Sequence, residues 1–244
     1  MARAIENPYS KILKLIGVSY GELAVELEEI FEGVEDVQYE LREEEDGIHL
    51  EFITVTSDKN KAYVKLIPYI AKLKARRGLD IYAENEEDTL EASLVKVLAD
   101  RRMTIATAES CTGGLVAATI INVSGASTVY EQGVITYTDE AKKELLGVSE
   151  ETLKEHTAVS YETAKEMAEK VAEISGTRIG VSTTGVAGPL GGTKDDPPGT
   201  VYIGVSINGE TTVKRCFFRG TRNTIRREAA RYAIDMVRRM AQEY

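Results

Sequence analysis

The alternation of apolar and polar positions divides the chain into two stretches of different pattern. The first stretch predicts, in order, helix over residues 1–35, strands over 36–43 and 49–56, a helix over 60–76 and a short strand over 79–82. Asp46-Gly47 is the turn signal between the two longer strands, and Gly78 ends the second helix. These elements form a small α+β unit close to the lower size limit for independent folding.

A charged segment without periodicity, Ala83–Asp88, follows this unit and is the expected domain boundary. We therefore predict a small N-terminal α+β domain over residues 1–87 and a larger domain over residues 88–244.

The larger domain contains apolar segments that switch between helical and strand periodicity. The pattern predicts, in order, a helix over 89–101, a strand over 103–108, a helix over 113–122, a loop over 123–127, a strand over 130–137, a short helix from Thr138 or Asp139 to Leu146, a helix over 160–175, a strand over 177–183, a Gly/Pro-rich loop over 184–199, strands over 200–207 and 211–218 around the hairpin signal Asn208-Gly209, and a helix over 222–241. This order predicts an α/β fold, with a mixed sheet and helices on both faces.

Composition indicates a globular protein with its own core, since 43% of the 244 residues are hydrophobic and 29% are charged. The net charge of −10 argues against nonspecific nucleic-acid binding and against an anionic membrane surface. No apolar run approaches the roughly 20 residues of a membrane span, and we identify no signal peptide. The two cysteines, Cys111 and Cys216, suit a reducing compartment, so the expected location is the cytoplasm.

Histidine is rare in this sequence, which contains only His49 and His156. A histidine-based metal cluster is therefore not expected, and no Cys-x-x-Cys pair offers an alternative. We predict that His156 lies in a connecting segment, which favours a satisfied or exposed histidine over a catalytic one. A serine nucleophile in this chain would then need a different base.

The stretch Thr107-Ala-Glu-Ser-Cys-Thr-Gly-Gly114 lies between two apolar runs and predicts a strand, a tight turn and a helix. Ser110 and Cys111 are neighbours on the turn, where the following glycines let the backbone approach a ligand beside free helical N–H groups. Such a turn suits an exposed nucleophile or an anion cradle. The alternative is an ordinary β–α turn with a threonine cap.

A neutral lysine can replace histidine as the base for a serine nucleophile. Lys142 fits this requirement, because the helix dipole disfavours positive charge in a first turn and because Leu145 and Leu146 border it. The alternative is an ordinary surface lysine, as we expect for Lys143. Tyr137, at the end of the preceding predicted strand, could relay or orient a proton or could cover the edge of the core.

Two further segments could line a pocket at the same edge of the sheet. Thr183-Thr-Gly-Val-Ala-Gly-Pro-Leu-Gly-Gly192 follows a predicted strand, and its glycines and proline shape a loop whose backbone can contact a ligand. Arg222 and Arg226 share one face at the start of the last helix. They suit a phosphate or a carboxylate, unless they are solvated charges paired with Glu228.

A basic cluster ends the predicted helix over 60–76 and consists of Lys72, Lys74, Arg76 and Arg77. Cations at this end of a helix are favourable against its dipole. The functional alternative is a small nucleic-acid patch, which the acidic surroundings make the weaker interpretation.

Seven segments of the larger domain carry a resemblance to a known family. They are Thr107-Ala-Glu-Ser-Cys-Thr-Gly-Gly114, Glu131-Gln-Gly-Val-Ile-Thr-Tyr-Thr-Asp-Glu-Ala-Lys142, Leu146-Gly-Val148, His156-Thr-Ala-Val-Ser160, Thr184-Gly-Val-Ala-Gly-Pro189, Pro198-Gly-Thr-Val201 and Arg222-x-x-x-Arg226. Together they resemble the CinA C-terminal domain, also called PncC, over residues 88–243. The resemblance implies a nicotinamide-nucleotide amidase, which hydrolyses the carboxamide of nicotinamide mononucleotide to nicotinic acid mononucleotide and ammonia. We expect no cofactor or metal, no nucleic-acid or membrane partner, and a homodimer.

The resemblance implies a Ser–Lys dyad, which falls on Ser110 and Lys142 in this chain. Ser110 would attack the carboxamide carbon, and Lys142 would take the serine proton. It also implicates Tyr137, Thr112 and Arg226. We expect Thr112 and the amides of residues 111–113 to stabilise the oxyanion, and Arg226, with Arg222, to hold the substrate phosphate. The remaining positions expected in the pocket are Cys111, Gly113, Gly114, Thr184, Gly185 and Gly188.

The chain departs from the family pattern at two places. Gly220-Thr-Arg222 stands where the family often has Gly-Asp-Arg, which affects how the arginine region is organised. Thr157 stands where the family often has glycine. Neither departure touches the dyad.

Residues 36–85 resemble the middle, KH-like domain of full-length CinA, which we expect to be a dimerisation or packing module because it lacks the Gly-x-x-Gly loop of an RNA reader. The larger molybdopterin-binding-like first domain has no room here, so its pyrophosphate cleavage and its metal requirement are expected to be absent. Two alternative functions stay open, a nucleotide sensor without turnover and an interaction protein linked to competence or DNA damage.

Overall fold

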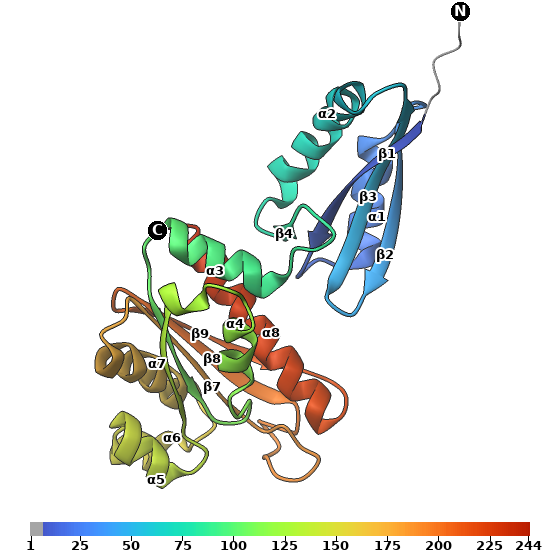
Figure 1. Cartoon of the computed structure of the whole chain (residues 1–244). Helices are drawn as coiled ribbons and strands as arrows, with labels where there is room; N and C mark the ends of the chain where they lie inside the picture. The colour runs from blue at the N-terminus through green and yellow to red at the C-terminus, as the bar shows by residue number, and fades with distance from the viewer. Residues whose placement is uncertain (1–6) are drawn as a thin grey trace, which may run out of the picture. The chain divides into compact units, whose positions relative to one another are not determined.

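The computed structural model describes residues 7–244 and divides into two compact units after Leu90 (Figure 1). The boundary that the sequence suggests, after residue 87, lies three residues before this division. Each unit has its own sheet and its own hydrophobic cluster.

The N-terminal unit is a four-stranded antiparallel sheet with two helices. Its elements are β1 (Asn7–Leu15), α1 (Tyr20–Ile30), β2 (Gln38–Glu44), β3 (Gly47–Thr56), α2 (Lys59–Arg77) and β4 (Ile81–Ala83). The strands lie in the order β2-β3-β1-β4, and all neighbours are antiparallel. This is the split βαβ arrangement of ferredoxin-like domains.

The prediction of helix over residues 1–35 is wrong for β1, and its first six residues lie outside the described part of the chain. β1 is a strand between β3 and β4, with Ile12, Leu13 and Leu15 buried. The apolar spacing of a nine-residue segment does not separate strand from helix. Pairing with two strands that lie far along the chain decides the outcome.

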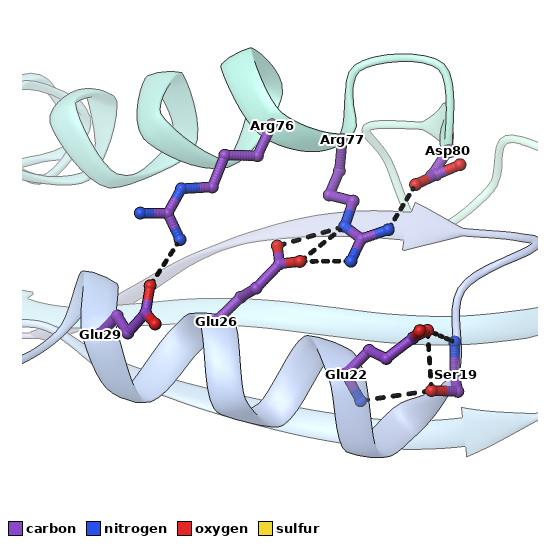
Figure 2. Close-up of polar contacts among 7 residues, drawn as sticks. All are labelled: Ser19, Glu22, Glu26, Glu29, Arg76, Arg77 and Asp80. Carbon is purple, nitrogen blue, oxygen red and sulfur yellow. Dashed lines mark hydrogen bonds and ion pairs between the residues drawn. The ribbon is translucent and has the colours of Figure 1, made fainter.

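A capping box begins α1, and ion pairs connect α1 with α2 (Figure 2). Ser19 and Glu22 form a capping box at the start of α1. The ion pairs are Arg77 with Glu26 and Asp80, Arg76 with Glu29, and Lys74 with Glu84. Three of the four cations in the basic cluster therefore have carboxylate partners, which favours the structural interpretation of that cluster over a nucleic-acid patch.

The C-terminal unit is built on a mixed sheet. Its elements are α3 (Leu90–Asp100), β5 (Ile105–Glu109), α4 (Leu115–Ile121), η1 (Ala126–Thr128), β6 (Tyr130–Ile135), α5 (Asp139–Ala141), η2 (Lys142–Leu146), α6 (Glu150–His156), α7 (Tyr161–Ser175), β7 (Ile179–Gly185), β8 (Thr200–Ile207), β9 (Glu210–Phe217) and α8 (Arg222–Ala241). The strand order is β6-β5-β7-β8-β9. β5 pairs in parallel with β6 and β7, whereas β8 and β9 join as antiparallel strands.

Helices α7 and α8 lie on opposite sides of this sheet, which confirms the predicted α/β class (Figure 1). Two glycines allow α7 to approach the strands closely. A Cβ on Gly180 would lie 2.0 Å from the Ala168 carbonyl oxygen, and one on Gly204 would lie 2.6 Å from that of Ala164. The sheet and its helices thus hold the carboxyl ends of β5, β6 and β7 in fixed register.

Three local predictions need correction in this unit. Helix α6 was not predicted, and His156 ends this helix instead of lying in a plain connection. Strand β6 ends at Ile135, so Tyr137 follows the strand. The helix after Thr138 is one α-helical turn that continues as the π-helical turn η2, which begins at Lys142.

Candidate active site

The turn between β5 and α4 lies at the carboxyl end of the parallel strands. Ser110 N–H donates to the Thr183 carbonyl on β7 at 2.9 Å, and Gly113 N–H donates to the Ser110 carbonyl at 3.1 Å. Gly113 and Gly114 have φ values of +60° and +92°, which glycine adopts without steric penalty. The turn is therefore a defined structure that β7 supports from below.

Glu109, the last residue of β5, is buried beneath the turn, and sequence reasoning missed it. Its carboxylate accepts a hydrogen bond from the Thr112 hydroxyl at 2.6 Å. It also accepts three backbone N–H groups at 2.8–3.1 Å, those of Gly114, Val116 and Ala117. A carboxylate at the start of α4 satisfies free N–H groups and is favoured by the helix dipole. The available signal was an acidic residue directly before a helix-starting turn.

Lys142 reaches Ser110 from the segment that follows β6. Its side chain is 1% exposed, and its Nζ lies 3.3 Å from Ser110 Oγ. The same Nζ donates to the Thr136 carbonyl at 3.0 Å. The structure thus brings together the two residues that the resemblance pairs, although they are 32 positions apart in the chain.

The surroundings of Lys142 favour an uncharged amine. Burial lowers the pKa of Lys142 below its ordinary value, while nearby Asp139 acts in the opposite direction. Within residues 7–244, Lys142 forms no ion pair with a carboxylate. A neutral amine beside a serine hydroxyl is the form that can accept its proton.

Cys111 is the neighbour of Ser110 but differs from it in reactivity. Its thiol is buried, and burial raises its pKa to about 12. The thiolate is the nucleophilic form of cysteine and is disfavoured under these conditions. Ser110 is therefore the better candidate nucleophile on this turn.

Thr112 has a supporting position under the turn. Its side chain is fully buried, and its hydroxyl donates to Glu109 and lies 2.6 Å from the Thr183 hydroxyl. A hydroxyl has one proton to donate. This geometry corrects the expectation that the Thr112 hydroxyl stabilises an oxyanion.

Arg226 contacts the turn itself. Its Nε donates to the Cys111 carbonyl at 3.1 Å, and its Nη2 donates to the Thr112 carbonyl at 2.7 Å. Its Nη2 also lies 3.1 Å from where a Cβ on Gly113 would stand. Arg226 is therefore placed to hold the turn, and less of its guanidinium is open to a phosphate than the sequence-based assignment assumed.

Arg222 links three segments at the edge of the site. One guanidinium nitrogen donates to the Gly188 carbonyl at 3.0 Å, and another donates to the Tyr137 hydroxyl at 3.0 Å. Tyr137 is 58% exposed, so it does not cover the core edge. Its hydroxyl is directed to the arginine.

The three expected pocket positions at the end of β7 and in the following loop have different surroundings. Thr184 is buried and donates to the Ala158 carbonyl at 2.5 Å. A Cβ on Gly185 would lie 2.7 Å from the Val201 Cα. Gly188, with a φ of +71°, instead lines a hollow of about 560 Å³. The other residues lining the hollow are Ala187, Pro189, Pro198, Phe217, Phe218, Arg219, Gly220, Thr221, Arg222 and Ile225.

Two further observations on the described residues concern metal ions and membranes. Among residues 7–244, no group of three or more His, Cys, Asp or Glu side chains is arranged to hold a metal ion. Over the same residues, no helix has both the length and the apolar character that crossing a membrane requires.

Comparison with known sequences relates the chain to one family. Residues 87–241 match the CinA C-terminal domain family. A CinA-like protein of Kosmotoga olearia is 42% identical over 231 residues, which are 95% of this chain and 56% of that protein. A putative competence-damage inducible protein of Clostridium perfringens is 44% identical over 182 residues, 75% of this chain and 44% of that protein. The chain spans about half the length of the curated relatives that it matches.

Solved structures give the same result for the C-terminal unit. A CinA superfamily protein of Klebsiella pneumoniae is 33% identical, with a TM-score of 0.62 over 64% of this chain and 97% of that chain. The competence/damage inducible protein of Agrobacterium tumefaciens is 36% identical, with a TM-score of 0.59 over 60% and 90% of the two chains. This chain therefore belongs to the CinA family, and residues 87–241 are its CinA C-terminal domain.

Proposed function

We propose that this protein hydrolyses the carboxamide of nicotinamide mononucleotide to nicotinic acid mononucleotide and ammonia. The observation that carries the proposal is the Ser110–Lys142 pair, a hydroxyl and an amine that are both buried and 3.3 Å apart. Ser–Lys pairs of this kind perform acyl transfer without histidine. The substrate itself comes from the resemblance of the C-terminal unit to the family amidase.

In the proposed first step, neutral Lys142 accepts the Ser110 proton while Oγ forms a bond to the carboxamide carbon. The carbonyl electron pair moves to oxygen and gives a tetrahedral anion. This step needs the lowered pKa of Lys142, which burial provides.

The oxyanion needs N–H donors that are not already used. Gly113 N–H is bound to the Ser110 carbonyl, whereas the N–H groups of Cys111 and Thr112 donate to no backbone carbonyl within the described chain and face only the weakly accepting sulfur of Cys111. We assign these two N–H groups to the oxyanion. The Cys111 carbonyl, which accepts from Arg226, belongs to the same planar peptide unit as the Thr112 N–H, so Arg226 orients that donor. The Cys111 N–H shares its peptide unit with the Ser110 carbonyl, which accepts from Gly113 N–H.

In the second step, protonated Lys142 gives its proton to the amide nitrogen, the C–N bond breaks and ammonia leaves. The substrate acyl group is then an ester of Ser110. Water loses a proton to Lys142 and attacks this ester, the bond to Oγ breaks, and Ser110 regains its proton. The product carboxylic acid ionises in solution.

The proposal is tested by measuring ammonia release from nicotinamide mononucleotide, with a chelator present. Ser110→Ala should abolish release and keep mononucleotide binding in calorimetry, because it removes one oxygen atom only. Cys111→Ala is the matched control on the same turn and should keep most of the activity. Binding without any release by the wild-type chain would favour a nucleotide sensor, and full activity of Ser110→Ala would overturn the assignment of the nucleophile.

A further inference from the structure

Strand β7 carries three consecutive hydroxyl residues near its carboxyl end, Ser182, Thr183 and Thr184, and all three are buried. Successive side chains of a strand point to opposite faces of its sheet. Ser182 and Thr184 donate to carbonyls of α7 and of the segment that precedes it. Thr183 points to the other face, where its hydroxyl lies 2.6 Å from the Thr112 hydroxyl. Thr183 is therefore directed at the turn that carries Ser110.

The hydrogen bonds around Thr112 determine which hydroxyl is the donor in this contact. A hydroxyl has one proton, and Thr112 donates its proton to the Glu109 carboxylate at 2.6 Å. The Thr183 hydroxyl must then donate to Thr112. The result is a relay from Thr183 through Thr112 to Glu109. Each of these side chains is at most 1% exposed, so water does not compete for either hydrogen bond.

Thr183 contacts the same turn with its main chain. Its carbonyl accepts the Ser110 N–H at 2.9 Å, while its hydroxyl donates to Thr112. These two contacts lie on either side of Cys111, and we refer to them together as the Thr183 clamp. Ser110 is the proposed nucleophile, and the N–H groups of Cys111 and Thr112 are the donors assigned to the oxyanion. The clamp therefore holds the groups whose relative positions matter for acyl transfer.

We propose that Thr183 is a positioning residue, which keeps Ser110 and the oxyanion donors in their reactive geometry through the Thr183 clamp. This rests on the proposed function, because it concerns the rate at which the same serine reacts. A shift of about 1 Å in a reacting group can cost roughly a hundredfold in rate, so the loss of one of two contacts should be measurable. The sequence-based assignment gave a pocket position to the neighbouring Thr184 instead, whose hydroxyl points to the opposite face of the sheet.

The first test is Thr183→Val, which replaces the donating hydroxyl by a methyl group of similar size. With nicotinamide mononucleotide, kcat should fall about tenfold with little change in KM, at a temperature where the variant is fully folded. Thr183→Ser restores the hydroxyl and should recover most of kcat. An unchanged kcat beside a lower melting temperature would show that Thr183 only stabilises the fold and would overturn the proposal.

Thr200→Val is the matched control for this substitution. Thr200 is a fully buried threonine on β8, and its hydroxyl has no hydrogen-bond partner among residues 7–244. The control variant should keep the kcat of the wild type. A loss of kcat equal to that of Thr183→Val would show that any buried threonine has this effect, and it would overturn the specific contribution of the clamp.

The relay itself can be tested without a substrate. Chemical denaturation of Thr112→Val, Thr183→Val and the double variant forms a double-mutant cycle. Because the two hydroxyls bond to each other, the double variant should lose less stability than the sum of the two single losses. Strictly additive losses would overturn the relay.

Phenylmethanesulfonyl fluoride separates failure of the clamp from failure of the amidase assignment. Ser110 Oγ forms a bond to sulfur, fluoride leaves and Lys142 accepts the serine proton. Labelling measured by mass spectrometry should be about tenfold slower in Thr183→Val and absent in Ser110→Ala. The same slowing in a chain that releases no ammonia would support the clamp and reject the substrate. Equal labelling rates, or a wild-type Ser110 that does not react, would overturn the clamp.

Discussion

Among residues 7–244, each of the two units buries one lysine, and the two lysines have opposite surroundings. Lys14 of the N-terminal unit is 5% exposed, donates to the carbonyls of Glu86 and Asp88, and lies 3.9 Å from the Asp46 carboxylate. Lys142 of the C-terminal unit is 1% exposed and contacts one carbonyl and the Ser110 hydroxyl. The first environment is built for a cation, and the second is built for a neutral amine.

The same difference extends to the backbone. Within residues 7–244, the three non-glycine residues with positive φ are Arg102, Thr157 and Asn208, and all of them lie in the C-terminal unit. Locally unfavourable features thus gather in the unit that holds the candidate site. The comparison teaches that burial alone does not distinguish the two lysines, whereas an ion pair does: Lys14 has one with Asp46, and Lys142 has none within residues 7–244.

The largest expected effect comes from Lys142→Met. Loss of the base should lower kcat at least about a thousandfold, the scale of removing a general base. The variant should be at least as stable as the wild type at neutral pH, because a buried amine is replaced by an apolar chain of similar length. Ammonia release and thermal unfolding measure the two effects. Lys143→Met is the control and should change neither, and a clear loss of stability in Lys142→Met would contradict the neutral-amine interpretation.

The pH dependence follows from the lowered pKa of Lys142. Activity requires the neutral amine, so kcat/KM should fall about tenfold per pH unit below the lowered pKa and flatten above it. For stability, the unfolded chain binds more protons between the lowered pKa and the ordinary value of 10.5, so wild-type stability should rise with pH through that window. A rate profile and denaturation at several pH values check both. Lys142→Met should lack the stability trend, and a wild-type rate that falls with rising pH would contradict this view.

Glu109 is a buried acid whose surroundings suit its charged form, and Glu109→Gln tests this. The amide would place N–H groups against backbone N–H donors that now share a carboxylate, which should cost about 2–3 kcal/mol of stability. Since the turn loses its anchor, kcat should fall with the stability. Chemical denaturation and ammonia release measure the two losses. An unchanged midpoint would show that Glu109 is not needed for the turn.

Lys14→Met should act in the opposite direction to Lys142→Met on stability. It removes a cation that satisfies two carbonyls and faces a carboxylate, so a loss of about 1–2 kcal/mol is expected. The rate per folded molecule should stay unchanged, because Lys14 belongs to the other unit. Lys11→Met, on the same strand, serves as a control. Equal stability changes in the two buried-lysine variants would remove the distinction between them.

The smallest expected effect is a gain from Thr157→Gly. Thr157 has φ +69° and ψ 170°, a region that is almost restricted to glycine. Glycine should therefore stabilise the protein by about 1 kcal/mol, despite its greater freedom in the unfolded chain. Asn208→Gly is the matched control, since asparagine tolerates its φ of +52° and should gain less. A lower midpoint for Thr157→Gly would disprove the strain.

The sequence predicted most elements of the C-terminal unit because their signals are local. The strand–turn–helix around Ser110, the Asn208-Gly209 hairpin and the last helix all depend on neighbours in the chain. The pairing of Ser110 with Lys142 needed the family resemblance, since no local rule states that residues 32 apart will meet. The position of Thr157 at a glycine site was visible from the same resemblance.

The failures have a common physical origin in contacts between distant residues. β1 was predicted as helix because the strands that pair with it lie far along the chain. Glu109 resembled an ordinary strand end, and its function appears only when α4 directs N–H groups at it. Thr112 and Arg226 were assigned to the ligand from motif position, whereas their hydrogen bonds go to the turn.

The π-helical turn η2 makes the candidate site sensitive to the length of the chain as well as to its composition. Leu146 and Val148, at and just beyond the end of this turn, are anchored in the core. Each residue of an α-helix turns the chain by about 100°, so removing one residue between these anchors and Lys142 would convert the wide turn to an ordinary one and rotate the amine away from Ser110. Inserting or deleting one residue here should therefore separate the Lys142 amine from Ser110, even though every remaining side chain is unchanged.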